Sequence, residues 1–286
     1  MKQIVYFIEF IIIKIFFFIF SMIGYKSSSN LGFITGKYFG PFFRSKSLII
    51  DNLKQAKIVS KKSYDNISLS VLGNYGRIFS EYVYLKDFRS GKLNNFITII
   101  GKEYLDEIIK KKEKVVFVSG HFNNFELMAM QLEMSGIDLA AIYRPLNNKY
   151  LNKNMEKIRK NFICKKQIKK GRSGSRELIR NFKQGSSIAL MIDQRVREGI
   201  NAPFFKRSAS TTTIPAQLVK KYNCEIVPIY IERVNDISFK LHISKPLKFE
   251  KDKSIFDITH ELNKILEKMI LQNVDQWIWT HNRWKK

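Results

Sequence analysis

The sequence is poor in the residues that mark disulfide frameworks, fibrous repeats or histidine-rich metal sites. Its two cysteines, Cys164 and Cys224, form no framework and fit a reducing compartment. Its 14 glycines and 6 prolines are too few for a collagen-like or linker-dominated chain, and four histidines leave little room for a histidine-rich metal site. With 45% hydrophobic residues over 286 positions, the chain is long and apolar enough for one large domain or two small ones.

Acidic residues are also scarce. There are 25 Asp and Glu against 50 Lys and Arg, which gives a formal net charge of +25. A charge of this size indicates the partners of a protein rather than its fold. It leaves three classes of partner open: nucleic acid, an anionic membrane surface and a phosphorylated substrate.

Residues 4–25 form a long apolar run that predicts a helix of roughly 30 Å, the thickness of the bilayer hydrocarbon. Glu9 and Lys14 interrupt it, and each costs about 2.5–3.5 kcal/mol at mid-bilayer, while each Ile or Phe returns about 0.3–0.6 kcal/mol. No signal-peptide cleavage site follows. We therefore predict a membrane anchor over residues 1–25, spanning or partly embedded; the alternative is a buried core helix.

The basic residues after this run outnumber those before it, chiefly Lys2; they are Lys26, Lys37, Arg44 and Lys46. This bias places the body of the protein on the cytoplasmic side of the membrane. An anionic membrane is then a better partner than nucleic acid, and no nucleic-acid partner is expected.

Residues 26–286 are predicted to form one catalytic domain, with a helical lead-in to about residue 110 and an α/β core over about 111–286. In the lead-in, Ile67, Val71, Leu72 and Tyr75 share one helix face. The core alternates short apolar strands with helices, which predicts an α/β fold with a mixed, largely parallel sheet flanked by helices. Strands are expected at 115–120, 139–143, 187–193, 225–234 and 238–244, and helices at 124–135, 150–162, 176–185, 213–223 and 254–273.

The most informative stretch runs from Ser119 to Glu126. His121 directly follows a buried strand, and Glu126 lies five positions further on. If the chain turns at Gly120 and Asn123 caps the next helix, Glu126 falls in its first turn and can hold one ring nitrogen of His121. This is the arrangement of a general base and its orienting carboxylate. The alternative is that Asn123 and Glu126 only cap the helix.

Two further polar clusters end predicted strands: Tyr143-Arg144-Pro145 and Asp193-Gln194-Arg195. Open α/β sheets bind ligands at such ends. Phe204 and Phe205 are expected in a loop, and the polar run 208–213 is expected to open a helix. Ordinary loop chemistry is the alternative for each cluster, but together they indicate a site beside His121.

These motifs resemble, in their order along the whole chain, the late acyltransferases of lipid A biosynthesis, lauroyl and myristoyl transferases of the glycerolipid acyltransferase superfamily with its His-x4-Asp/Glu motif. The resemblance rests on Gly120–Glu126, Tyr143–Pro145, Asp193-Gln194, Pro203–Phe205 with the threonine run, Val227-Pro228, and Gln276–Trp279 with His281 and Arg283. One departure is Lys206-Arg207, where many members have a glycine after the paired phenylalanines.

The resemblance implies that His121 is a general base, oriented by Glu126, for an O-acyltransfer without an acyl-enzyme, cofactor or metal. The acyl donor would be acyl carrier protein, the acceptor a hydroxyl of a phosphorylated, Kdo-bearing lipid A precursor, and the location the inner membrane, with the catalytic domain on its cytoplasmic face. Arg144, Asp193, Gln194 and Asn123 would bind substrate, and Phe204 and Phe205 would line an acyl channel. The basic tract from Lys149 to Arg176 would face anionic lipid or the acidic carrier.

Three alternatives stay open. The nearest is an acyltransferase of the same superfamily that acts on another acceptor, such as a lysophospholipid or an aminolipid. A membrane-tethered nucleic-acid-binding protein would fit the charge, but the sequence has no helix-turn-helix, zinc or RNP-like signature. The third is a non-catalytic membrane scaffold.

Overall fold

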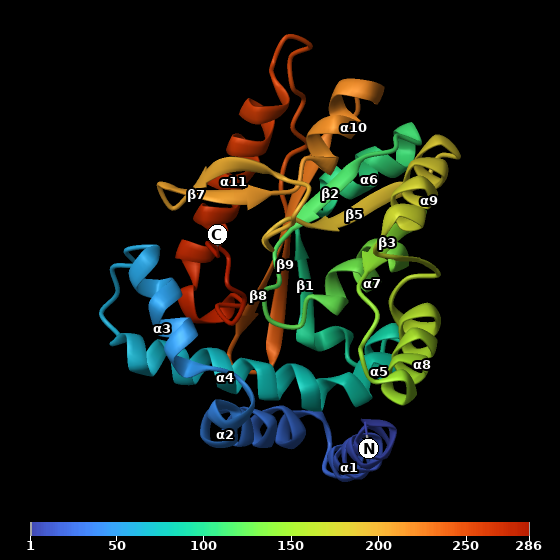
Figure 1. Cartoon of the computed structure of the whole chain (residues 1–286). Coiled ribbons are helices and arrows are strands. Elements are labelled where there is room, and N and C mark those ends of the chain that lie inside the picture. Colours follow the sequence, from blue (N-terminus) through green and yellow to red (C-terminus); the bar gives the residue numbers. More distant parts are fainter. Residues whose placement is uncertain (1, 286) are drawn as a thin grey trace.

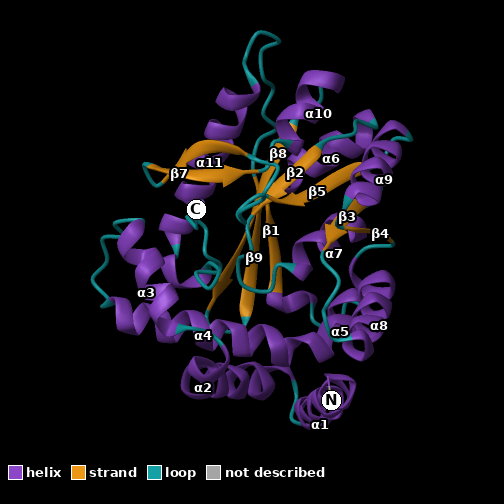
Figure 2. Cartoon of the chain, in the orientation of Figure 1, coloured by secondary structure: helices purple, strands orange, loops and turns teal. Residues whose placement is uncertain are grey.

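The computed structural model describes residues 2–285, without the side chain of Arg172. The side chain of this member of the basic tract, the first residue of the predicted anchor and the last residue of the predicted catalytic domain therefore lie outside what the structure describes. The described chain forms a mostly parallel sheet with helices on both faces (Figure 2), as the alternating strand and helix pattern predicts.

The main sheet has seven strands in the order β1-β9-β8-β2-β5-β3-β4. All neighbours are parallel except β8 and β9, which form a hairpin. The strands are β1 (Ile97–Ile100), β2 (Val116–Ser119), β3 (Leu139–Tyr143), β4 (Lys166–Lys169), β5 (Ser187–Met191), β8 (Ile226–Val234) and β9 (Ser238–Ile243). The turn predicted between β8 and β9 is confirmed, and its residues Asn235 and Asp236 have φ values of 48° and 64°.

A separate hairpin of β6 (Ile200–Phe204) and β7 (Arg207–Thr211) corrects the prediction for this region. Phe204 ends a strand, and the polar run from Ser208 pairs with β6; the helix α10 (Ile214–Tyr222) begins only after it. The turn is made by Phe205 and Lys206, with φ values of 50° and 58°. Lys206 thus occupies a left-handed position that favours glycine.

The lead-in consists of α1 (Lys2–Met22), α2 (Tyr25–Phe43), α3 (Lys46–Gln55), α4 (Tyr64–Glu81), η1 (Tyr82–Tyr84), α5 (Leu85–Arg89) and η2 (Asn94–Phe96). The core helices are α6 (Lys102–Lys111), α7 (Glu126–Met134), α8 (Lys149–Ile158) with the π-helical turn η3 (Arg159–Ile163), α9 (Arg172–Lys183), α10, α11 (Ile255–Gln272) and η4 (Val274–Gln276). Figure 1 shows α4 running beneath the sheet, with α1 and α2 below it.

Helix α2 packs against α4 at backbone contact. A Cβ atom added to Gly76 of α4 would lie 1.9 Å from the carbonyl oxygen of Gly32, and one added to Gly36 would lie 2.4 Å from the carbonyl oxygen of Leu72. The glycines of both helices therefore permit a crossing that any larger residue would separate. This contact fixes α2 to the underside of the domain.

Candidate active site

The site begins at the carboxyl end of β2, where the chain leaves the buried sheet at Gly120 and presents His121. A Cβ atom on Gly120 would lie 2.9 Å from Leu266 Cδ1 and 3.2 Å from Asp193 Oδ2. Glycine at this position therefore lets the carboxylate of Asp193 approach the backbone closely. Asp193 follows β5, the strand next to β2, so the two residues meet because their strands are parallel neighbours.

Asp193 is fully buried and receives three hydrogen bonds. Its Oδ1 lies 2.8 Å from His121 Nδ1, and its Oδ2 accepts from the backbone N–H of His121 at 2.7 Å and from Trp277 Nε1 at 2.9 Å. A carboxylate held by three donors fixes the ring that it contacts. The same geometry removes the His121 N–H from the groups available to stabilise an oxyanion.

The pairing of His121 with Asp193 shifts the pKa of both side chains. Burial by itself lowers the pKa of the His121 imidazole, but the charge and hydrogen bond of Asp193 outweigh it, so the pKa lies above its usual value. Burial by itself raises the pKa of Asp193, and the charge of His121 with the bonds from His121 and Trp277 outweighs it, so this pKa lies below its usual value. With Nδ1 turned to Asp193, Nε2 is the ring nitrogen left for proton transfer.

The predicted contact between Glu126 and the imidazole is wrong. Glu126 begins α7, as expected, but its Oε1 accepts from Arg159 Nε at 2.9 Å, Arg159 Nη2 at 2.6 Å and the Tyr82 hydroxyl at 2.7 Å. The left-handed backbone of Asn123, with φ of 41°, turns the chain between His121 and the helix and separates the two side chains. Glu126 therefore joins α7 to η1 and η3, while Asp193 takes the orienting position.

Asn123 does not cap α7, whose N-cap residue is Phe125 and makes no side-chain capping bond. Instead Asn123 Nδ2 donates to the carbonyl of Ile231 at 3.0 Å and to Gln276 Oε1 at 2.7 Å. Its Oδ1 is buried and has no hydrogen-bond partner among the described residues. Asn123 thus brings an unused acceptor to the side of His121.

A small cavity of about 20 Å³ opens beside His121 and Asn123. Its lining residues come from α4, the His121 loop, and η4 with the segment after it: Val71, Asn74, Tyr75, Ile78, His121, Asn123, Phe125, Gln276, Trp277 and Ile278. A volume of this size admits one water-sized group. The cavity therefore fits the hydroxyl end of a substrate next to the imidazole, while a larger body lies outside it.

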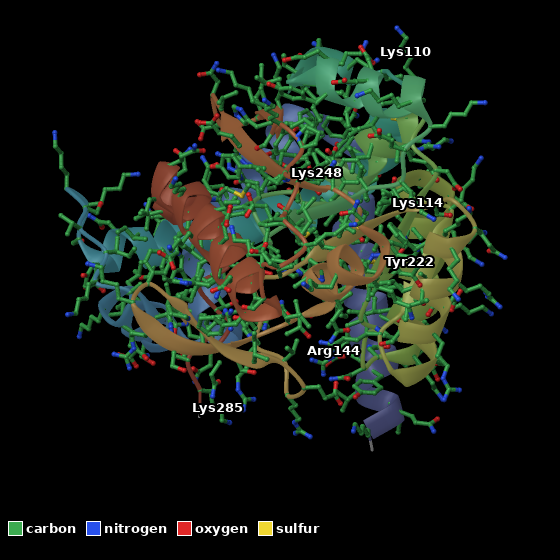
Figure 3. The ribbon with its side chains drawn as sticks, turned by 90° about the horizontal axis from the view of Figure 1, so that it is seen from above. Lys110, Lys114, Arg144, Tyr222, Lys248 and Lys285 are labelled. Carbon is green, nitrogen blue, oxygen red and sulfur yellow. The ribbon has the colours of Figure 1, made fainter. Side chains whose placement is uncertain are left out.

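Of the other residues predicted for the site, Arg144 and Gln194 lie at the ends of the neighbouring strands β3 and β5, and Phe204 lies in the core. Arg144 directly follows β3 and is exposed (Figure 3), with no hydrogen bond to any described residue in the structure. Gln194 follows Asp193 and is half-buried. Phe204 is fully buried against Trp277 and Trp284, which makes it a packing residue and not the wall of an open channel.

The C-terminal segment supplies contacts to which the sequence assigned no role. Trp277 donates to Asp193, and His281 Nε2 accepts from the backbone N–H of Arg195 at 3.0 Å. Burial lowers the pKa of His281, which keeps the imidazole neutral and able to accept. Arg283 donates to Ser210 O and Thr211 Oγ1, and burial lowers its pKa to about 10. The tryptophan-rich motif was the only signal in the sequence for these contacts.

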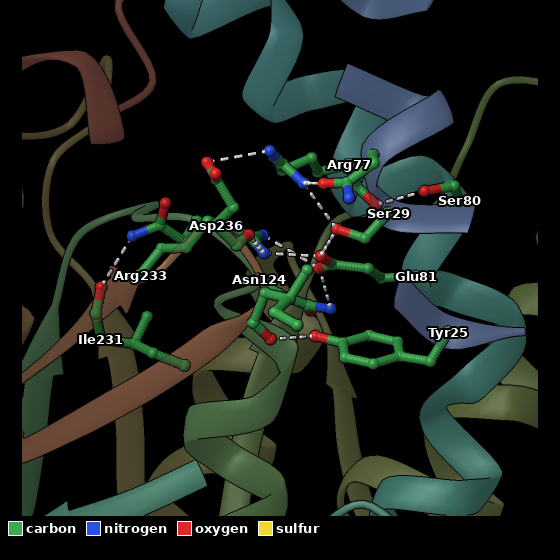
Figure 4. A network of polar contacts seen from close by, with 12 residues as sticks. Tyr25, Ser29, Arg77, Ser80, Glu81, Asn124, Ile231, Arg233 and Asp236 are labelled. Carbon is green, nitrogen blue, oxygen red and sulfur yellow. Dashed lines mark hydrogen bonds and ion pairs between the residues drawn. The ribbon is translucent and has the colours of Figure 1, made fainter. Parts of the chain in front are cut away.

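A buried ion network supports the loop from the side of the lead-in helices (Figure 4). Glu81 of α4 is fully buried and accepts from Arg233 of β8 at 2.6 and 3.0 Å, and from Ser29 of α2 at 2.7 Å. Asn124, three residues after His121, donates to Glu81 Oε2 at 3.1 Å. The network therefore ties α2, α4 and β8 to the loop that carries the imidazole; no residue pattern in the sequence indicated it.

Residues 1–286 match the family described as bacterial lipid A biosynthesis acyltransferase. The chain is 25% identical over 207 residues to a lipid A biosynthesis lauroyltransferase of Escherichia coli K12, with 68% of this chain and 63% of that protein covered. It is 26% identical over 205 residues to a lipid A biosynthesis acyltransferase of Haemophilus influenzae, with 68% and 62% covered. An E. coli lipid A biosynthesis palmitoleoyltransferase is 25% identical over 201 residues, with 68% and 63% covered. The chain thus spans less than two thirds of the length of these relatives.

Proposed function

Because the chain belongs to the bacterial lipid A biosynthesis acyltransferase family, we propose that it transfers a fatty acyl chain from the thioester of acyl carrier protein to a hydroxyl of a Kdo-bearing lipid A precursor. The observation that carries the proposal is His121, which is fixed by Asp193 through Nδ1 and lines a cavity of the size of a hydroxyl group. The lauroyl and palmitoleoyl transfer named for the relatives supports the choice of an acyl group.

In the proposed reaction, His121 Nε2 removes the proton of the acceptor hydroxyl as its oxygen attacks the thioester carbonyl. The C–O bond forms, the tetrahedral intermediate collapses with loss of the C–S bond, and the imidazolium returns its proton to the leaving thiolate. Asp193 holds the reactive tautomer and stabilises the imidazolium. The acyl group moves directly to the acceptor, so no covalent acyl-enzyme is formed.

The remaining residues of the site have supporting roles in this proposal. Glu126 is required through Arg159, which it holds between α7 and η3, and so acts as a positioning residue. Asn123 Oδ1, the unused buried acceptor, receives a hydrogen bond from a polar group of the acceptor. Arg144 and Gln194, which lie at neighbouring strand ends, bind the phosphate or sugar of the head group.

The proposed location is the inner membrane, with the catalytic domain on its cytoplasmic face. The apolar helix α1 supports membrane association, because it is the one helix among the described residues long and apolar enough to cross a bilayer. The net charge of +25 supports an anionic membrane, a phosphorylated acceptor and an acidic donor.

The test is an acyl-transfer assay with purified full-length protein, acyl carrier protein loaded with a fatty acyl chain, and a Kdo-bearing lipid A precursor, analysed by mass spectrometry. We expect one added acyl chain with the wild-type protein and a loss of about 10²–10⁴-fold in rate for His121→Ala, because the general base is removed. The matched control is His260→Ala on α11, which should keep the wild-type rate.

The same assay separates the alternative function. A lysophospholipid or an aminolipid that is acylated, while the lipid A precursor is not, would replace the proposed acceptor and leave the reaction type in place. Wild-type activity in the His121→Ala protein would refute the catalytic assignment itself.

A further inference from the structure

Helix α1 contacts the domain along its whole length through one narrow seam. The residues of α1 that are buried or half-buried lie three or four positions apart; they are Tyr6, Phe10, Ile13, Phe17 and Phe20. This is the spacing of a helix packed along its axis against a partner. Helix α1 therefore lies alongside the domain and does not project away from it.

Both halves of α1 are fastened to the domain. Near its start, Asn148 Nδ2 donates to Tyr6 O at 2.8 Å and to Glu9 Oε2 at 3.0 Å, and the Tyr150 ring packs on Phe7 at 5.6 Å between centroids.

Near the end of α1, Phe17 and Phe20 pack on Phe79 of α4, with ring centroids 5.0 and 6.1 Å apart, and the Tyr84 hydroxyl donates to the carbonyl of Phe20 at 2.5 Å. The anchored positions Tyr6 and Phe20 are about 21 Å apart along the axis at 1.5 Å per residue. A fixed stretch of this length sets the direction of the helix relative to the domain.

The pictures show this direction. In Figure 1, α1 is seen end-on beneath α4, and in Figure 3, which is turned by 90°, it is seen lengthwise. Figure 1 shows α2 lengthwise at the same lower face. The axes of both helices therefore run along the underside of the molecule.

The polar residues of α1 border the seam. At 100° per residue, Lys2, Gln3, Glu9, Lys14 and Ser21 all lie within about 80° of the centre of the seam. The arc opposite the seam carries only apolar side chains, and the large exposed ones are Ile4, Val5, Phe7, Ile8, Ile11, Ile12, Ile15, Phe18, Ile19 and Met22. The helix thus has one face toward the domain, a polar border on each side and an apolar face below.

Helix α2 continues this apolar underside. Its exposed apolar side chains are Leu31, Ile34, Tyr38, Phe39, Phe42 and Phe43, the last two being 83% and 84% exposed. Basic residues stand around both helices: Lys14 on α1, Lys26 on α2 and Lys149, which begins α8 next to the Asn148 contact with α1, are all exposed. An apolar face with a basic border fits the surface of an anionic bilayer.

We propose that α1 is not a transmembrane span but lies flat in the interface of an anionic membrane, together with the exposed face of α2. The seam faces the domain, the polar border lies at the lipid head groups, and the apolar arc enters the acyl region. Asn148, which binds Tyr6 and Glu9, directly precedes α8. If α1 spanned the membrane, the start of α8 with its exposed Lys149 and Lys153 would be carried into or across the hydrocarbon. In the interface, Glu9 and Lys14 stay at the head groups and avoid that cost.

The first experiment determines the topology of the full-length protein in sealed anionic vesicles of phosphatidylglycerol and phosphatidylethanolamine, using a membrane-impermeant maleimide. The single additions Gln3→Cys and Ser21→Cys mark the two ends of α1, and Lys248→Cys, exposed between β9 and α11, marks the domain side. The unmodified chain controls for Cys164 and Cys224, which are buried. We expect all three introduced cysteines to react from the same side. Reaction of Gln3→Cys only from the side opposite Lys248→Cys would overturn the proposal.

The second experiment compares two lysine pairs that occupy the same ends of α1 but different faces. Ile4→Lys with Met22→Lys places charge in the apolar arc, whereas Gln3→Lys with Ser21→Lys places it on the polar border. In co-sedimentation with the same vesicles, we expect the first pair to weaken binding about 100-fold, because two buried apolar side chains are lost. The second pair should bind at least as tightly as wild type.

Equal effects of the two pairs would indicate a span, whose ends both lie at an interface, and would overturn the proposal. Wild-type protein that does not bind the vesicles, or that covers this face in a stable dimer by analytical ultracentrifugation, would overturn it as well. The proposal rests on the membrane association in the proposed function and not on its reaction. Because neither readout uses acyl transfer, its failure is distinguishable from failure of the proposed activity.

Discussion

Two fully buried carboxylates, Asp193 and Glu81, have different surroundings. Glu81 accepts hydrogen bonds from Ser29, Asn124 and the guanidinium of Arg233. Asp193 holds the ring of His121, whose side chain keeps 19% of its exposure and lines a small cavity. Burial and pairing are therefore shared by the two carboxylates. What separates them is the partner: a guanidinium for Glu81, and for Asp193 a partly exposed imidazole that lines a cavity.

The comparison predicts that removing the charge of Asp193 affects the reaction most. Asp193→Asn should lower the rate of acyl transfer by about 10²–10⁴-fold, because the amide no longer holds the reactive tautomer or stabilises the imidazolium. The protein should remain folded in circular dichroism, since the amide still fills the same space. Asp252→Asn, on an exposed loop, is the matched control and should leave the rate unchanged.

The pH profile of Asp193→Asn tests whether Asp193 raises the pKa of His121. In the wild type, Asp193 raises the pKa of His121, and only the neutral imidazole accepts a proton, so activity should fall as the pH drops through this raised pKa. In Asp193→Asn the effect of burial remains and lowers the pKa, so the acid limb of kcat/KM should move to lower pH. An acid limb that stays in place would show that another group controls it.

The structural carboxylate should give the opposite result. Glu81→Gln leaves Arg233 buried with its positive charge uncompensated, so we expect the free energy of unfolding to fall by about 3–5 kcal/mol in denaturant titrations. The fraction that remains folded should keep an acid limb at the wild-type pH, because the His121 pair is untouched. Glu107→Gln, in an exposed pair with Lys111, should show little change. A shifted acid limb in Glu81→Gln would contradict the division between the two carboxylates.

Glu126 should give an intermediate result in each assay, with a smaller loss of stability than Glu81→Gln and a smaller loss of rate than Asp193→Asn. Its partner Arg159 keeps 14% of its side-chain exposure, so Glu126→Gln should reduce stability by less than Glu81→Gln, about 1–3 kcal/mol. The displaced start of α7 should lower the rate by about 10-fold with an unshifted acid limb. An acid limb that moves as far as in Asp193→Asn would return Glu126 to the role of the orienting carboxylate.

The sequence predicted the fold well where its signal was local. Alternating apolar strands and periodic helices located the strand Leu139–Tyr143 to the residue and the other central strands to within two residues. It missed β1 and β4, which are four residues long and half exposed, and the β6–β7 hairpin, whose turn is made by Phe205 and Lys206 and not by glycine. These elements depend on tertiary pairing more than on composition.

In the candidate site, the sequence singled out His121 and Asp193 but did not predict that they pair. His121 and Asp193 both ended predicted strands, yet the sequence favoured Glu126 as the orienting group because it is nearer along the chain. Arg159, Tyr82 and Glu81 carried no sequence signal, since a charged or hydroxyl residue in a helix is ordinarily solvated. Their roles exist only because the helices that carry them pack around the His121 loop.

The sequence by itself determined that α1 is apolar and that the core is a largely parallel α/β sheet, and it singled out His121 as the candidate base, because helix period, strand period and motif are properties of neighbouring residues. Only the tertiary structure decided that Asp193, 72 positions away, orients the imidazole, because this depends on which strands lie side by side. Likewise, the positions of Glu9 and Lys14 in the sequence do not place them on one polar stripe of a helix. They flank the seam of α1 only because the domain covers the face between them.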